Sequence, residues 1–129
     1  LVTPASDLRP MGGDRLANEG RDPLIKWHGL LDRAYAAYSP ALDRNDPEVS
    51  PVLGDYTGLQ VPVMVTTAEH DLFRPDILAL VRALESARVP VRLDDASGLW
   101  HSYQQYDLDE ASSGLRRMCS FITDALGRT

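Results

Sequence analysis

The stretch Val61–Asp71 (VPVMVTTAEHD) constrains the fold more than any other part of the chain, because a short apolar run rich in β-branched residues ends in three consecutive ionisable residues. Strands that are buried on both faces of a parallel sheet are almost continuously apolar. Open α/β sheets carry their functional loops beyond the carboxyl ends of such strands. The stretch therefore predicts a buried strand that ends in functional residues.

A βαβ unit is predicted from this strand onward. A second strand-like run follows at Val89–Leu93, and the residues between the two runs recur at helical spacing, at Ile77, Leu80, Val81, Leu84 and Ala87. The fold class is therefore α/β, with a mainly parallel sheet and flanking helices. Because such a crossover can set two parallel strands side by side, we expect the loops that carry Asp71 and His101 to be neighbours at one edge of the sheet.

Two further helices and an irregular loop are expected. Asp22 and Pro23 are of the residue types found at a helix N-cap and first position. The helix that they begin is expected to end at Ser39-Pro40, since the residue before a proline is disfavoured in the α region. Residues 40–58 contain closely spaced turn formers and predict an irregular loop. A C-terminal helix that ends at Gly127 is predicted from Leu115, Met118, Cys119, Ile122 and Leu126.

Composition narrows the classes of function. The 129 residues fit one domain, and an apolar content of 43% supplies a core of ordinary size. The net charge of −6 argues against a nucleic-acid partner, which would need clustered Lys and Arg. The single cysteine, Cys119, excludes a disulfide framework and is expected to pack in the core. The sequence has no apolar run long enough to span a bilayer, and a cytoplasmic location is the default expectation.

An acid and a base on neighbouring loops suit one kind of chemistry. The Asp71 carboxylate would fix the tautomer of His101 and stabilise the imidazolium that forms when the histidine takes a proton from a nucleophile. On spacing alone, a loop histidine without a role and a helix-entry aspartate remain open. Trp100 either lines an apolar substrate pocket or packs the loop. A metal site is disfavoured, because neighbouring strand residues point to opposite faces and no second histidine lies at ligand spacing from His70.

The sequence does not supply a nucleophile for such chemistry. A G-x-S-x-G elbow, the strained turn that exposes a catalytic serine, does not occur. Ser97 and Ser113 lack the paired glycines of such a turn, and Ser6, Ser39 and Ser50 lie in proline-rich contexts. An acyl transfer that used Asp71 and His101 would therefore need a serine from elsewhere.

Several short motifs occur in an order and spacing that is more specific than any one of them. They are Pro4 with Asp7, Asp22–Leu24, Asp46–Val52 followed by Gly58–Pro62, Asp71–Asp76 and Gly98–Tyr103. Over nearly the whole chain this series resembles the α/β-hydrolase esterases of the hormone-sensitive-lipase type, which include bacterial acetyl esterases and carboxylesterases. The departures are Leu72 for a proline, Pro75 for an aspartate and Ser102 for the glycine after the histidine, and they affect pocket shape and substrate preference.

The resemblance implies a role for each member of the acid–base pair. Asp71 corresponds to the acid and His101 to the general base of a Ser-His-Asp triad, while Phe73, Leu99 and Trp100 are the expected substrate-binding residues. The resemblance implies no cofactor and no metal. The implied activity is hydrolysis of a carboxylic ester, in which the histidine activates first a serine and then a water.

The resemblance also implies that residues 1–129 are the C-terminal segment of one α/β-hydrolase domain, with about residues 10–50 as a cap-side insertion. The oxyanion loop and the nucleophile elbow of the family would lie before Leu1. The strand that ends at Pro4 would then have a bare inner edge, which favours association with the N-terminal half, a partner chain or a second copy. The alternative is a catalytically silent module that acts in assembly. In either case we expect the chain alone to be inactive on esters.

Overall fold

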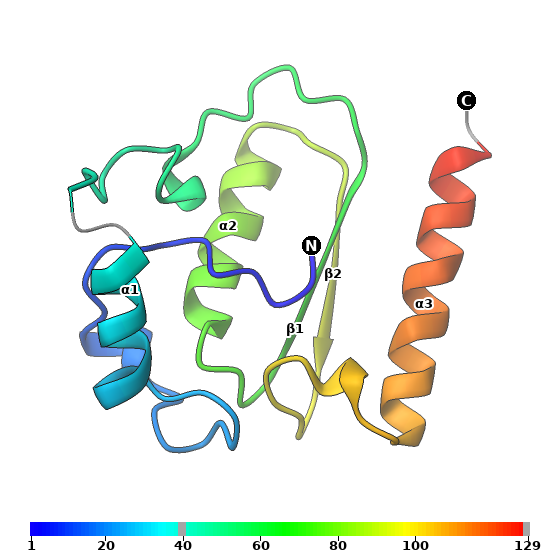
Figure 1. The fold of residues 1–129 in the computed structure, drawn as a ribbon. Coiled ribbons are helices and arrows are strands. Elements are labelled where there is room, and N and C mark those ends of the chain that lie inside the picture. Colours follow the sequence, from blue (N-terminus) through cyan, green and yellow to red (C-terminus); the bar gives the residue numbers. More distant parts are fainter. Residues whose placement is uncertain (39–40, 128–129) are drawn as a thin grey trace.

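The computed structural model describes residues 1–38 and 41–127 (Figure 1). Its central unit consists of strand β1 (Val63–Ala68), helix α2 (Arg74–Ser86) and strand β2 (Val91–Ala96). The two strands are parallel, and their register pairs Val63 with Val91 and Ala68 with Ala96. The βαβ unit expected from the apolar periodicity is thus confirmed, and both strands end at the same edge of the sheet.

Residues 1–3 form a short strand-like segment on the other side of β1. Val2 makes a parallel bridge with Thr66, the Thr3 N–H donates to the Thr66 carbonyl (3.0 Å), and the Thr66 N–H donates to the Leu1 carbonyl (2.9 Å). β1 is therefore the central strand, and all but its first residue are buried. Within the described residues, no strand pairs with the far edge of residues 1–3.

Helix α2 covers one face of the strand pair (Figure 1). Its apolar positions are buried, Ile77 completely, and they pack with Val65 and Phe73 in the main core cluster. Trp27 and Tyr35 join this cluster and contact each other edge to face, with their ring centroids 5.3 Å apart. Because each large apolar side chain contributes about 1.5–3 kcal/mol on burial, this cluster is the main source of stability for the strands and the loops at their ends.

The first helix, α1 (Asp32–Tyr38), begins later than the sequence predicts. It is preceded by a kinked turn, η2 (Trp27–Leu31), in which His28 and Gly29 have non-helical backbone angles and Gly29 has a positive φ (83°). The expected start at Asp22 is wrong, although the Asp22 carboxylate does accept backbone N–H groups. The physical reason is that the residue before Trp27, Lys26, is extended and interrupts the helix, while the Glu19 carboxylate accepts the N–H of Trp27 (2.8 Å).

An irregular connection leads from α1 to β1, as the turn formers predict. It includes a 3₁₀ turn, η3 (Pro51–Leu53), and is held to the N-terminal loop by Ser50. The Ser50 hydroxyl is buried, accepts the N–H of Leu8 (3.0 Å) and donates to the Arg44 carbonyl (2.7 Å). The helix end expected at Ser39-Pro40 lies outside the described residues.

A cluster of ion pairs ties the N-terminal loop to the start of α2. Arg15, in the 3₁₀ turn η1 (Gly13–Leu16), donates to both carboxylate oxygens of Asp76, at 2.6 and 2.8 Å. Arg9 pairs with Asp7 at 2.7 Å. Burial acts to raise the pKa of Asp7, but the hydrogen bonds from Arg9 and the charges of Arg15 and Arg9 together outweigh burial, so that this pKa lies below its ordinary value. The cluster keeps the N-terminal loop in a fixed position over α2.

Helix α3 (Asp109–Leu126) stands on the side of the strands opposite α2 (Figure 1). Its buried Gly114 faces the side chain of Tyr103 in the 3₁₀ turn η4 (Tyr103–Gln105). The expectation that Cys119 packs in the core is wrong, because this cysteine is exposed. The apolar positions that share its pattern are exposed as well, namely Leu115, Ile122 and Leu126. The physical reason is that the narrow sheet of the described chain does not cover this face of the helix.

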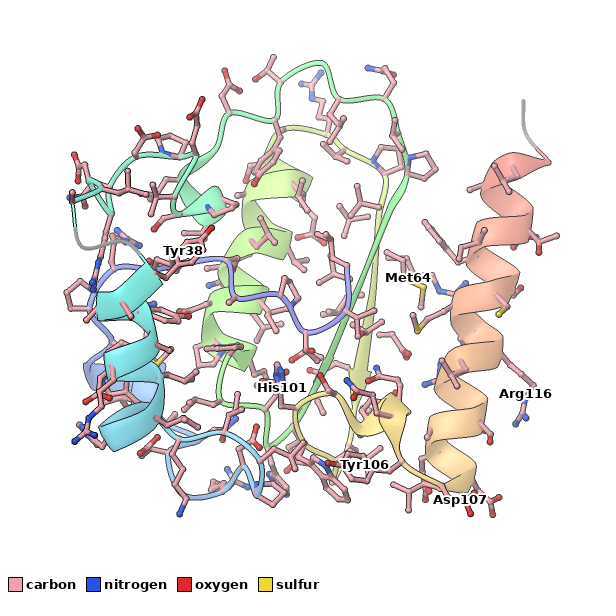
Figure 2. All side chains as sticks on the ribbon, in the orientation of Figure 1. Tyr38, Met64, His101, Tyr106, Asp107 and Arg116 are labelled. Atoms are coloured by element: carbon pink, nitrogen blue, oxygen red, sulfur yellow. The ribbon has the colours of Figure 1, made fainter. Side chains whose placement is uncertain are left out.

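A groove of about 230 Å³ separates α3 from β1. It is lined mainly by apolar residues: Leu1, Pro62, Val63, Met64, Thr66, Met118, Phe121 and Ile122. Figure 2 shows Met64 on the side of the strands that faces α3. The groove and the unpaired edge of residues 1–3 lie next to each other, since Leu1 belongs to both.

Candidate active site

The loop that follows β1 fixes the Asp71 side chain. This carboxylate is completely buried. One of its oxygens, Oδ1, accepts the N–H of Phe73 (2.9 Å), and the other accepts the Thr67 hydroxyl (3.2 Å). The Asp71 N–H in turn donates to the Ala68 carbonyl (3.0 Å). These bonds fix the orientation of the carboxylate, so the site presents an oriented acceptor at the end of the central strand.

The loop that follows β2 brings His101 to this acceptor. The distance from His101 Nδ1 to Asp71 Oδ1 is 3.1 Å. The imidazole also contacts the ring of Phe73 edge to face, with centroids 5.4 Å apart, and its side chain is 18% exposed. Figure 2 shows His101 in the central part of the molecule. With Nδ1 donating to the carboxylate, Nε2 of the neutral ring is left as a proton acceptor.

The two loops are joined along their length by hydrogen bonds. The N–H of Glu69 donates to the Ala96 carbonyl and the N–H of His70 donates to the Leu99 carbonyl, both at 2.9 Å. The Glu69 carboxylate accepts the N–H of Gly98 (2.8 Å) and the Ser97 hydroxyl (2.9 Å). These bonds from Gly98 and Ser97 lower the pKa of Glu69. The Glu69 side chain and the His70 backbone therefore hold the two loops together.

The three expected substrate-binding residues occupy two places. Phe73 lies against the His101 ring. Leu99 and Trp100 pack on the second core cluster, and the indole of Trp100 contacts the Tyr106 ring edge to face at 5.8 Å. Only Phe73 of the three is in ring contact with the acid–base pair, and the substrate role of all three stays a prediction.

The sequence does not predict the part that two polar residues play in the site. The Asp22 carboxylate accepts the N–H of Leu72 (3.1 Å) and the N–H of His101 (3.3 Å). The Asn18 side-chain amide donates to the carbonyls of Glu69 and Asp71, both at 2.9 Å. Neither contact has a local signal, because the partners are far apart in the sequence. The Asp-Pro step at Asp22 indicates only a turn or a helix cap.

The described residues supply no further member of a catalytic set. None of the hydrogen bonds of His101 is made with a serine; Ser97 bonds to Glu69, and the Ser102 hydroxyl lies 3.1 Å from that of Thr3. In the part of the chain that the structure describes, no group of three His, Cys, Asp or Glu side chains could hold a metal ion. None of the helices in these residues is both long and apolar enough to cross a membrane.

Comparison with known proteins agrees with this arrangement. A family model described as the alpha/beta hydrolase fold matches residues 1–105. The chain belongs to this family. The family expected from the motifs is thereby confirmed, as is the α/β fold class. The parallel strands, the crossover helix and the polar loops at the strand ends of this hydrolase chain are thus part of a known architecture.

Individual relatives match over most of the hydrolase chain. An ethyl acetate hydrolase of Pseudomonas putida is 35% identical over 118 residues, which are 88% of this chain and 35% of that protein. An esterase of Acinetobacter venetianus is 25% identical over 95% of this chain and 41% of its own length. The crystal structure of an esterase named E25 superposes with a TM-score of 0.86 at 27% identity, covering 97% of this chain and 39% of that one. The chain therefore spans well under half the length of the proteins that it matches.

Proposed function

We propose that the hydrolase chain supplies the acid and the base of a serine carboxylesterase, with Asp71 as the triad acid and His101 as the general base. The observation that carries the proposal is the 3.1 Å contact between His101 Nδ1 and Asp71 Oδ1 at the ends of neighbouring parallel strands. The relatives named esterase and ethyl acetate hydrolase support the reaction class. The alternative of a silent assembly module has no such support.

In the proposed reaction, His101 Nε2 takes the proton of a serine hydroxyl as the serine attacks the ester carbonyl. Asp71 stabilises the imidazolium through Nδ1, and the imidazolium then gives its proton to the leaving alcohol. The acyl-enzyme is hydrolysed by a water that the same histidine deprotonates. Phe73, Leu99 and Trp100 are proposed to contact the substrate, and short-acyl esters are the substrate class, by analogy with the Pseudomonas relative.

The serine and the oxyanion hole are proposed to come from an N-terminal half of the same hydrolase domain. Residues 1–129 would then be its C-terminal segment, with about residues 10–50 on the cap side. Two features support this arrangement. The groove between β1 and α3 leaves apolar side chains uncovered by the described residues. The edge at Leu1 leaves backbone N–H and carbonyl groups without a strand partner in the described residues. A homo-oligomer through the same surface is the second way to cover it. The cytoplasmic location stays a prediction.

Covalent labelling tests the proposal. The full-length protein, meaning the product of the longest open reading frame that contains this chain, is treated with a fluorophosphonate and digested for mass spectrometry. We expect one modified serine, in a G-x-S-x-G sequence outside residues 1–129, and much slower labelling after His101→Ala. An adduct on a serine within residues 1–129, or ester hydrolysis that proceeds without any serine adduct, would contradict the proposal.

A further inference from the structure

Asp22 binds backbone N–H groups from three separate segments. Its Oδ1 accepts from Leu24 (2.9 Å) and Ile25 (3.3 Å), which is the local turn that an Asp-Pro step predicts. Its Oδ2 accepts from Leu72 (3.1 Å) and His101 (3.3 Å). The residue is only 2% exposed. A single carboxylate thus joins the cap-side segment to the acid loop and to the base loop.

The two Oδ2 contacts lie where the relative position of the loops matters most. One N–H belongs to the residue directly after Asp71, and the other belongs to His101 itself. Both donors meet at one oxygen atom, so their separation is limited by the two hydrogen-bond lengths. The distance between Asp71 and His101 depends on the separation of the two loops, because one loop carries the acid and the other carries the imidazole.

The Asp22 side chain is itself held in place by a rigid turn. Gly20 takes a left-handed conformation (φ 78°), and the N–H groups of Arg21 and Asp22 donate to the Asn18 carbonyl at 3.0 and 3.4 Å. The Asn18 amide donates in turn to the carbonyls of Glu69 and Asp71. The turn is therefore fixed to the acid loop by Asn18, and from this fixed turn the Asp22 side chain bonds to the base loop.

The charge of Asp22 gives the contacts their strength. Burying a carboxylate without partners is costly, and none of the ion pairs formed by the described residues includes Asp22. The carboxylate is instead stabilised by four N–H dipoles, two of which belong to the catalytic loops. Hydrogen bonds to a charged group are stronger than those between neutral groups. Displacing either loop would leave the buried charge short of a donor.

We propose that Asp22 is a positioning residue that sets the distance between Asp71 and His101 by holding both loops on one oxygen. This inference rests on the proposed function, which makes Asp71 and His101 the catalytic acid and base. It assigns to the cap-side segment a direct part in aligning the acid and the base, in addition to any contact that the segment makes with substrate.

The test compares Asp22→Ala, Asp22→Asn and Asp7→Asn in the full-length protein. Asp7 is a matched control: it is 3% exposed and accepts a backbone N–H from Arg9 (3.0 Å), but its carboxylate bonds to Arg9 and Arg15 and not to the acid or base loop. With p-nitrophenyl acetate we expect kcat to fall about 100-fold for Asp22→Ala, with KM little changed. Asparagine keeps one acceptor oxygen but has no charge and turns an NH2 donor toward one pair of N–H groups, so we expect Asp22→Asn to recover only part of the loss. Asp7→Asn should reduce stability but leave kcat unchanged.

The imidazole Nδ1 proton of His101 provides a readout that does not depend on ester hydrolysis. In the NMR spectrum of the full-length protein we expect a strongly downfield-shifted proton from the bond to Asp71. It should be lost in Asp22→Ala and present in Asp22→Asn and Asp7→Asn. The proposal is overturned if folded Asp22→Ala keeps this signal, or if Asp7→Asn lowers kcat as much as Asp22→Ala does. An unmodified protein that shows the signal without hydrolysing esters would refute the proposed function alone.

Discussion

At the scale of single residues, the side chains of the site are held partly by hydrogen bonds to groups that are near in space but distant in the sequence. Asp71 and His101 could be predicted from the sequence, because each follows an apolar run and a crossover helix joins the runs. The roles of Asp22 and Asn18 could not, because each side chain bonds to loops that lie far away in the chain. Spacing indicates which residues share a sheet edge, but it does not indicate which distant polar group is buried against that edge.

Glu69 provides a pH prediction at this scale. Its pKa is lowered by the bonds from the Gly98 N–H and the Ser97 hydroxyl. A lowered pKa in the folded state means that these bonds are fully present above the ordinary pKa of a glutamate and are lost as the pH falls through the lowered value. We expect the Gly98 amide to report a titration with a midpoint below 4.5, the ordinary value, in NMR spectra of the full-length protein.

The variant Glu69→Gln is the control for this titration. Glutamine does not ionise in this range, so the Gly98 amide shift should be flat between neutral and acid pH. A midpoint above 4.5, or an unchanged titration in Glu69→Gln, would show that Glu69 does not hold the two loops together through its charge.

At the scale of elements, apolar periodicity located β1, α2, β2 and α3. The second strand runs from Val91 to Ala96 and is thus displaced from the apolar run Val89–Leu93 that predicted it. Periodicity misplaced the start of α1, because Lys26 is extended and the Glu19 carboxylate accepts the N–H of Trp27 from outside the expected helix. It also placed Cys119 in a core that the described chain does not form around α3. The error at α1 arises from a tertiary contact and the error at Cys119 from the absence of one, and a local sequence pattern contains neither.

The docking of α3 on the base loop yields a prediction for Gly114. A Cβ at this position would lie 2.7 Å from the hydroxyl oxygen of Tyr103, which is fully buried and follows His101 closely. Overpacking costs about 1–3 kcal/mol, against a gain of about 1 kcal/mol from helix propensity. We therefore expect Gly114→Ala to lower the free energy of unfolding by up to about 2 kcal/mol in urea titrations of the full-length protein.

A double-mutant cycle isolates this contact. Tyr103→Phe removes the hydroxyl and leaves the ring carbon at an ordinary 3.4 Å from the new Cβ, so Gly114→Ala should cost much less in that background. Ser112→Ala, at an exposed position of the same helix, should be neutral or slightly stabilising. An equal cost of Gly114→Ala in both backgrounds would mean that the Tyr103 contact does not control the docking of α3.

At the scale of the whole molecule, the described chain leaves one side incomplete. Ile122 and Leu126 are 54% and 68% exposed, and the groove beneath α3 is open beside the unpaired edge at Leu1. Exposed apolar patches of this kind mark interfaces or lead to association. Together with the share of each relative that the chain covers, this face supports the proposal that another half of a hydrolase domain packs here.

The size of the isolated chain tests this view of the molecule. We expect the 129-residue polypeptide to self-associate in sedimentation velocity, increasingly so with concentration, because its apolar groove has no other partner. Ile122→Lys, in the groove, should weaken the association. Ser120→Lys, at an exposed position of α3 that does not line the groove, should not. A chain that stays monomeric at all concentrations, or association that Ser120→Lys weakens equally, would contradict this prediction.

The most direct test of the central claim, that Asp71 and His101 are the acid and the base of a serine esterase, is the hydrolysis of p-nitrophenyl acetate. We expect the full-length protein to be active, His101→Ala to lower kcat by at least about 1,000-fold, and the 129-residue chain alone to show no turnover. Turnover by the chain alone that His101→Ala abolishes would contradict the proposal that the nucleophile lies elsewhere. Full activity of the His101→Ala protein would contradict the assignment of the base.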